Sequence, residues 1–136
     1  MTLKISVAIA NARLDAYETV IGTAPILRIR EGSPPANIAA ASTGAILASL
    51  TLPSDWMAAA ASGVKSKSGT WQDLSADASG TAGYFEITAS DGTTRHMQGT
   101  ITAVSGGGDM EIDNVSIAAG QQVSVVTFSI SAAANL

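Results

Sequence analysis

The hydrophobic positions of the first 21 residues fit two different periods. One pattern is the alternation of a β-strand, seen at Leu3, Ile5, Val7 and Ile9. A longer stripe recurs at every third or fourth residue, as on one face of a helix. That stripe consists of Val7, Ala10, Leu14, Tyr17 and Ile21. Gly22 follows the stripe, and glycine commonly ends a helix because it adopts a left-handed conformation without strain. The pattern therefore predicts a helix of about four turns over residues 6–21.

Short runs of hydrophobic and β-branched residues follow this segment. In the first run, residues 26–31, Leu27 and Ile29 alternate with Arg28 and Arg30, as in a half-exposed strand. The further runs cover residues 45–52, 64–67, 70–74, 82–89, 93–104, 110–117 and 121–131. Eight such runs without an intervening helix predict a mainly β protein, an eight-stranded antiparallel β-sandwich with one N-terminal helix. We expect residues 1–22 to form the helical segment and residues 23–136 the sandwich domain.

Turn signals separate the expected strands. Asp91-Gly92 is a strong hairpin signal, because this pair readily adopts positive φ angles, and the glycines at 106–108 are expected to form another hairpin tip. Pro34 and Pro35 each lack a backbone donor, so residues 32–44 are expected to form a long loop.

The last run contains a change of parity. Val123 and Val125 belong to one face of a strand, whereas Phe128 and Ile130 belong to the other. A single strand can bury both pairs only if an extra residue is inserted between them. The pattern therefore predicts a β-bulge in this strand.

The composition describes one small domain with a thin core. The chain has 136 residues, of which 46% are hydrophobic but only 4% aromatic. Trp56 and Trp71 are therefore expected to fill the core. The absence of cysteine excludes disulfides, thiolate metal sites and thiol nucleophiles. No apolar run is long enough to span a membrane, so we expect a soluble chain without a leader.

The charges argue against nucleic-acid binding. The formal net charge is −4, and no cluster of basic residues forms the continuous stripe that neutralises phosphates. Residues 1–67 carry six basic and four acidic side chains, whereas residues 68–136 carry one basic and seven acidic ones. If the fold separates these halves, neighbouring copies can meet with complementary charges.

Candidate catalytic groups are few. The chain has one histidine, His96, and no Gly-x-Ser-x-Gly motif. We therefore expect His96 to be a surface or half-buried polar side chain on a strand, which forms local hydrogen bonds. The glycines at 106–108 lack the Lys-Ser/Thr and the helix of a phosphate loop. We therefore expect no catalytic residue and no cofactor.

Three acidic residues alternate after the glycine run. Asp109, Glu111 and Asp113 would project from one face of a strand, which leaves calcium binding open. Along a strand, however, these side chains spread over about 13 Å instead of converging on one ion. A solvated strand edge that deters pairing with other chains is the favoured interpretation, and no metal site is expected.

Several short segments resemble a family of small proteins found among the virion structural genes of tailed bacteriophages and prophages. These segments are NARLD (11–15), LPSDWMAA (52–59), KSGTW (67–71), SDGT (90–93) and SIAAGQ (116–121). The resemblance implies a jelly-roll-like capsid cement (decoration) protein, which adds contact area between subunits of the major capsid protein without performing chemistry. It also implies synthesis in the bacterial host cytoplasm and a place in the virion, on the outer surface of the capsid. A tail or fibre-associated protein, including a receptor-binding module, is the alternative.

Attachment to neighbouring virion subunits is expected at the helix and the long loop. The candidate interface residues are Val7, Leu14, Tyr17, Ile21, Pro34 and Pro35. The competing explanation is that the helix closes one end of its own sandwich, since an amphipathic pattern does not identify its partner. The thin core also predicts that copies of the chain associate with one another.

Overall fold

The computed structural model describes residues 3–132 and residue 136, and its first element is α1 (Val7–Ile21). The Ser6 hydroxyl caps the start of the helix by accepting a hydrogen bond from the backbone N–H of Ile9 at 3.2 Å. At the other end, Gly22 has a φ of +89° and donates its N–H to the Glu18 carbonyl. The helix predicted from the hydrophobic stripe is therefore confirmed, together with its glycine stop.

Nine strands follow α1 in the described part of the chain. They are β1 (Ile26–Glu31), β2 (Ile46–Thr51), β3 (Val64–Ser66), β4 (Gln72–Asp73), β5 (Gly80–Thr88), β6 (Arg95–Ala103), β7 (Met110–Ile112), β8 (Ser116–Ile117) and β9 (Val123–Ser131). The ninth strand arises because the predicted run 110–117 is divided into β7 and β8. The side chain of Asn114 accepts the N–H of Ser116 at 2.9 Å in the intervening turn, so the pairing cannot continue there.

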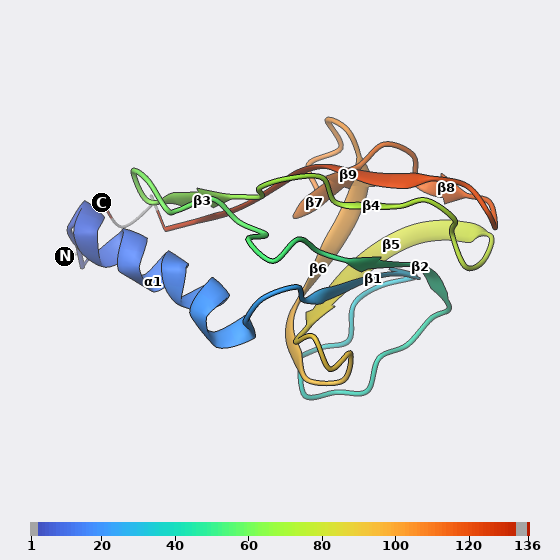
Figure 1. Ribbon diagram of the computed structural model, residues 1–136, viewed down its shortest axis with the longest axis horizontal. Helices are drawn as coiled ribbons and strands as arrows, with labels where there is room; N and C mark the ends of the chain where they lie inside the picture. Colours follow the sequence, from blue (N-terminus) through green and yellow to red (C-terminus); the bar gives the residue numbers. More distant parts are fainter. Residues whose placement is uncertain (1–2, 133–135) are drawn as a thin grey trace.

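The strands form one curled, mixed sheet (Figure 1). Their order is β2-β1-β5-β6-β7-β9-β3, with β4 beside β9 and β8 beside β5. Strands β6 and β7 run parallel, so the expectation of antiparallel pairing throughout is wrong. The glycine-rich segment between them does not form a hairpin tip. Positive φ angles at Ser105 (+68°) and Gly107 (+81°) turn the chain back so that Met110 pairs with Ile101.

The free edge of β2 is covered by the chain itself. The carbonyl of Leu47 accepts the backbone N–H groups of Asp77 and Ala78, and the carboxylate of Asp73 accepts the N–H of Ser49 at 3.1 Å. Because Asp73 belongs to β4, which pairs with β9, the two ends of the sheet approach each other. This curling encloses the core and protects an edge that would otherwise invite pairing with other chains.

Aromatic side chains occupy the centre of the core, as expected for both tryptophans. Trp56 and Trp71 have ring centroids 6.0 Å apart, and Phe128 lies 5.6 Å from Trp71. Phe85 extends this row of aromatic rings through an edge-to-face contact with Phe128, at a centroid distance of 5.5 Å. These four rings therefore connect the segments before and after β3 with β5 and β9, in a core that is otherwise built from small and medium aliphatic groups.

The predicted bulge is present in β9. Thr127 pairs with Glu111 and Val125 pairs with Ile112, which leaves Val126 without an opposite residue. The extra residue changes the parity, so Val125 and Phe128 are both buried while Val126 is exposed.

Candidate functional site

Helix α1 is attached to its own chain through a buried lysine. Lys65 on β3 is 1% exposed, and its ammonium lies 2.7 Å from Asp15 Oδ1 and 2.6 Å from Glu18 Oε1. It also donates to the carbonyl of Ala58 at 2.9 Å. Burial alone would lower the pKa of Lys65, but the hydrogen bonds to the two carboxylates outweigh it and raise the pKa above its usual value. The hydrogen bond from Lys65 likewise holds the pKa of Asp15 below its usual value.

Further hydrogen bonds fix both ends of the helix. The Asn11 side chain accepts the N–H of Gly63 at 3.0 Å, and the Trp56 indole donates to the carbonyl of Gly22 at 3.0 Å. Between these points, the side chains of Leu14 and Ile21 are only 3% and 5% exposed. These two members of the predicted interface are therefore covered by the chain itself, as in the competing explanation in which the helix closes its own domain.

A second face of α1 is uncovered. It consists of Ile9, Arg13, Ala16, Tyr17 and Val20, which recur at helical spacing, and we call it the outer face. Val20 is 67% exposed and Ile9 is 52% exposed, while Tyr17 is half exposed. Val7, another member of the predicted interface, is also half exposed. The sequence pattern predicts one apolar stripe on this helix. In the structure, Val7 and Tyr17 of that stripe are exposed, and Ile9 and Val20 add further exposed apolar groups.

Three adjoining hollows separate the outer face from β6 and β9. Their volumes are about 410, 260 and 340 Å³, and Tyr17 lines all three. Ile38 from the long loop and Ile130 from β9 add apolar walls to the first hollow, which Asp109 borders. Arg13 borders the second and third hollows. The hollows form one groove with an apolar middle, a basic group toward one end and an acidic group toward the other.

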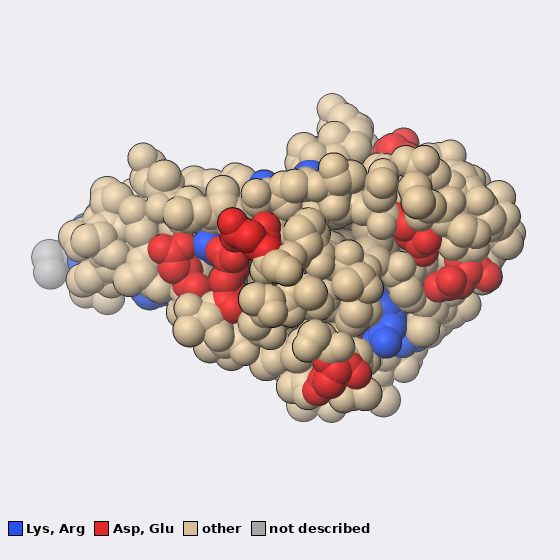
Figure 2. Space-filling view, viewed as in Figure 1, with Lys and Arg blue, Asp and Glu red and all other residues tan. Residues whose placement is uncertain are grey.

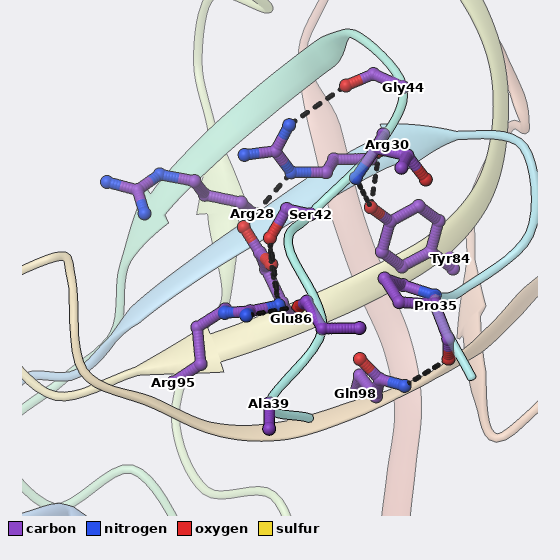
Figure 3. Close-up of polar contacts among 12 residues, drawn as sticks. Arg28, Arg30, Pro35, Ala39, Ser42, Gly44, Tyr84, Glu86, Arg95 and Gln98 are labelled. Atoms are coloured by element: carbon purple, nitrogen blue, oxygen red, sulfur yellow. Dashed lines mark hydrogen bonds and ion pairs between the residues drawn. The ribbon is translucent and has the colours of Figure 1, made fainter. Parts of the chain in front are cut away.

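The long loop, residues 32–44, lies over a buried carboxylate on the outer side of the sheet (Figure 3). Glu86 on β5 is 1% exposed, accepts from Arg30 Nε at 3.0 Å and accepts from the Ser42 hydroxyl at 2.5 Å. Arg95 Nη1 lies 3.9 Å from Glu86 and donates to Ser42 Oγ at 3.0 Å. The carboxylate is closed off from any substrate, so this cluster holds the loop on the sheet.

Glu86 is not among the candidate residues predicted from the sequence, although the sequence contains one signal for it. It is the only acidic residue in the run 82–89, and Arg28 and Arg30 alternate on another strand. The signal was insufficient because the pairing of β1 with β5, which places Arg30 beside this face, joins segments that are far apart in the sequence.

The two prolines of the predicted interface lie within this loop. Pro34 and Pro35 are half-buried, and the carbonyl of Pro35 accepts a hydrogen bond from the Gln98 side chain at 2.7 Å. The other side-chain atom of Gln98, Oε1, is buried and has no hydrogen-bond partner among the described residues. The loop is thus packed against its own sheet, and only part of each proline is accessible to another molecule.

His96 lies on β6 beside the groove and is half-buried, as expected. Its imidazole forms no hydrogen bond or ion pair with the residues that the structure describes, so the expected local hydrogen bonds are not seen. No described serine or carboxylate is hydrogen-bonded to it in the manner of a catalytic pair. His96 contributes to the wall of the groove.

The three alternating acids serve separate local roles. Asp109 accepts from the N–H and hydroxyl of Thr100, at 2.9 and 3.0 Å, while Glu111 accepts from the hydroxyl of Thr127 at 3.0 Å. Asp113 accepts the N–H of Ser124 at 3.1 Å. Within residues 3–132 and 136, these acids do not gather into a group that could hold a metal ion.

The exposed strand edge that was expected at Asp109, Glu111 and Asp113 is not present in the structure. Strand β7 lies between β6 and β9, so both of its sides are paired. The interpretation as a solvated edge is therefore wrong, because the chain turns back into the sheet at the glycine run. Hydrogen bonds from backbone Gly107 and from the Thr127 hydroxyl lower the pKa of Glu111, consistent with an ionised group that holds this turn.

Acidic groups on the visible face of the molecule lie in several separate clusters, and basic groups there are sparse (Figure 2).

Comparison of the chain with protein-family models, curated proteins and solved structures finds no match. Among the described residues, no helix has the length and apolar character required to cross a bilayer.

Proposed function

We propose that this chain is a non-enzymatic structural protein of a tailed-bacteriophage virion, and specifically a capsid cement protein. In this role it sits on the outer surface of the capsid, after synthesis in the bacterial cytoplasm, and binds between subunits of the major capsid protein. Its other partners are further copies of itself. The sequence segments at 52–59 and 116–121, among others, support the proposal by their resemblance to virion proteins.

One structural observation carries the proposal furthest: exposed apolar side chains gather at the helical end of the molecule. Ten large hydrophobic side chains are exposed among the described residues, and half of them lie within residues 3–20: Leu3, Val7, Ile9, Tyr17 and Val20. Clustered exposed apolar groups of this kind mark surfaces that bind other proteins. A protein that stabilises a shell by adding contact area needs such a surface and needs no catalytic centre.

The shape of the molecule fits attachment through this end. Helix α1 lies to one side of the curled sheet, next to β3 and the end of β9 (Figure 1). The surface there combines a helix and a short strand, and Ile38 of the long loop borders the same groove as Tyr17. The jelly-roll-like sandwich remains part of the proposal, as the finer description of the curled sheet.

A binding experiment tests the attachment. Val7 occupies the first turn of α1, where aspartate is compatible with a helix because its charge favours the positive end of the helix dipole. Val7→Asp should therefore keep the fold but weaken binding to capsids that lack the protein. Val104→Asp, at an equally exposed valine after β6, is the matched control and should bind normally. Equal binding by the two variants contradicts attachment through the first turn of α1.

A tail or fibre-associated role is the alternative, and the copy number separates it from the cement role. Purified virions should contain the chain in numbers comparable with the major capsid protein if it is a cement protein. Quantitative mass spectrometry of whole virions measures this ratio. A ratio far below one, matching the tail proteins, favours the alternative.

A further inference from the structure

Helix α1 carries more apolar surface than its own chain uses. The buried stripe of Ala10, Leu14 and Ile21 already attaches the helix to the domain, with Lys65 fixing the same side. The outer face nevertheless presents large apolar groups, including Ile9 and Val20. A helix that is apolar on two faces is typical of one that packs against two neighbours.

The groove beside the outer face carries a basic and an acidic side chain at different places, so the groove of one copy can match the groove of another. Arg13 borders the hollows at one part of the groove and forms no ion pair or hydrogen bond with the described residues. Asp109 borders the hollow at another part and is exposed. Tyr17 lines every hollow, so it borders the part of the groove near Arg13 as well as the part near Asp109.

We propose that the groove and the outer face form the contact between two copies of this chain, related by a two-fold axis that passes near Tyr17. Such an axis exchanges the two parts of the groove. Arg13 of one copy then faces Asp109 of the other, and the symmetry repeats this ion pair. The exposed Val20 of each copy covers the apolar walls that Ile38 and Ile130 provide in the other.

The features of the groove favour a second copy over an unrelated protein. An unrelated partner would have to supply an acidic group, an apolar ridge and a basic group at matching positions. A second copy supplies all three at once, since each is already part of the same surface. The small side chain of Ala16 in the middle of the outer face also permits close approach of the two helices.

This pairing names the self-association that the proposed capsid role includes, and it rests on that role only for its biological use. Ile9, Tyr17 and Val20 face the second copy, while Leu3 and Val7 at the start of the helix stay exposed for the capsid contact. The test therefore uses the purified chain without virions. Sedimentation equilibrium should give twice the 13.6 kDa mass of one chain, whereas a monomer at all concentrations overturns the pairing but leaves capsid binding untouched. A series of higher masses also overturns it, because a two-fold contact is closed after two copies.

Charge reversal tests the predicted ion pair. Arg13→Glu and Asp109→Lys, each alone, should raise the dimer dissociation constant by about tenfold or more, because each places two like charges in contact. Mixing the two variants should restore association, since the mixed dimer contains one original pair and one reversed pair. Wild-type affinity of either single variant, or failure of the mixture to recover, contradicts the proposed contact.

A cross-linking experiment covers the case in which Asp109→Lys does not fold, since Asp109 also binds Thr100. The chain has no cysteine, so one can be introduced at Ala16, on the outer face, and at the control position Ala8 on the same helix. A short bis-maleimide should link two copies of Ala16→Cys and leave Ala8→Cys largely unlinked. Equal linking of the two variants, or no linking of Ala16→Cys, overturns the two-fold arrangement.

Discussion

Replacing Lys65 by methionine removes the central contact between α1 and the rest of the chain. The lysine side chain is almost fully buried, and its ammonium contacts Asp15, Glu18 and the carbonyl of Ala58. Methionine has a similar length and fills most of the same space, but it cannot donate a hydrogen bond. The substitution therefore isolates the polar contribution of the cluster from its packing.

The expected loss follows from the surroundings of the two carboxylates. Removing one partner of a fully buried ion pair costs about 3–5 kcal/mol, and a hydrogen bond to a charged group contributes about 1.5–3 kcal/mol. The side chains of Asp15 and Glu18 are 48% and 25% exposed, so water can replace part of the lost contact. We expect Lys65→Met to lower the free energy of unfolding by about 2–3 kcal/mol.

Urea denaturation followed by tryptophan fluorescence measures this loss. The matched control is Lys67→Met, two residues further along the chain. Among the described residues, its ammonium contacts only the carbonyl of Gly69 and the ring of Trp71. The control should lose less than about 1 kcal/mol, because its charge remains accessible to water. Equal losses of stability for the two variants refute the role of Lys65 in attaching α1 to the rest of the chain.

The pH dependence gives an independent check. The pKa of Asp15 is lowered from 3.8, so its contribution is present above that value and is lost as the pH falls through the folded-state pKa. The pKa of Lys65 is raised from 10.5, so its contribution is present below that value and is lost as the pH rises through the folded-state pKa. The difference in stability between wild type and Lys65→Met should therefore be constant near neutral pH and shrink in strong acid. A difference that is unchanged in acid contradicts the ion-pair explanation.

Four further substitutions test other parts of the structure by urea denaturation. Glu86→Ala leaves two arginines without their buried counter-charge, so it should cost about 3 kcal/mol and make the loop 32–44 more sensitive to protease. Unchanged protease resistance would contradict the role of Glu86 in holding the loop on the sheet. Gly44→Ala should cost about 1–3 kcal/mol, because φ is +78° and a Cβ would lie 2.2 Å from the carbonyl oxygen of Glu31; a neutral effect would be inconsistent with this turn. Asp91→Ala should destabilise the chain at neutral pH but hardly in strong acid, since hydrogen bonds from the side chain and backbone of Thr94 hold the pKa of Asp91 far below 3.8. His96→Ala should cost less than about 1 kcal/mol, and a much larger loss would reveal a polar role for the imidazole.

Local features of the fold were predictable from sequence because their signals lie within a few residues. The spacing of Ala10, Leu14 and Ile21 marks the helix, and Gly22 marks its end. The parity change between Val125 and Phe128 marks the bulge in β9, since a strand can bury both residues only with one extra residue between them.

Features that depend on distant pairing were not predictable. Three glycines allow the chain either to reverse as a hairpin or to return alongside the same strand, so the parallel direction of β7 could not be read from residues 106–108. The same limit applies to the candidate site. Nothing near Lys65 in the sequence shows that the helix carboxylates surround it, and the groove forms only when α1 meets β6 and β9.

We propose that this chain is part of the capsid surface. Cryo-electron microscopy of the intact virion, with the structure fitted into the map, tests it most directly. The proposal predicts repeated density for this chain on the outer surface of the capsid, with the helical end against the major capsid protein. Density confined to the tail or its fibres, or no density for the chain in the virion, contradicts it.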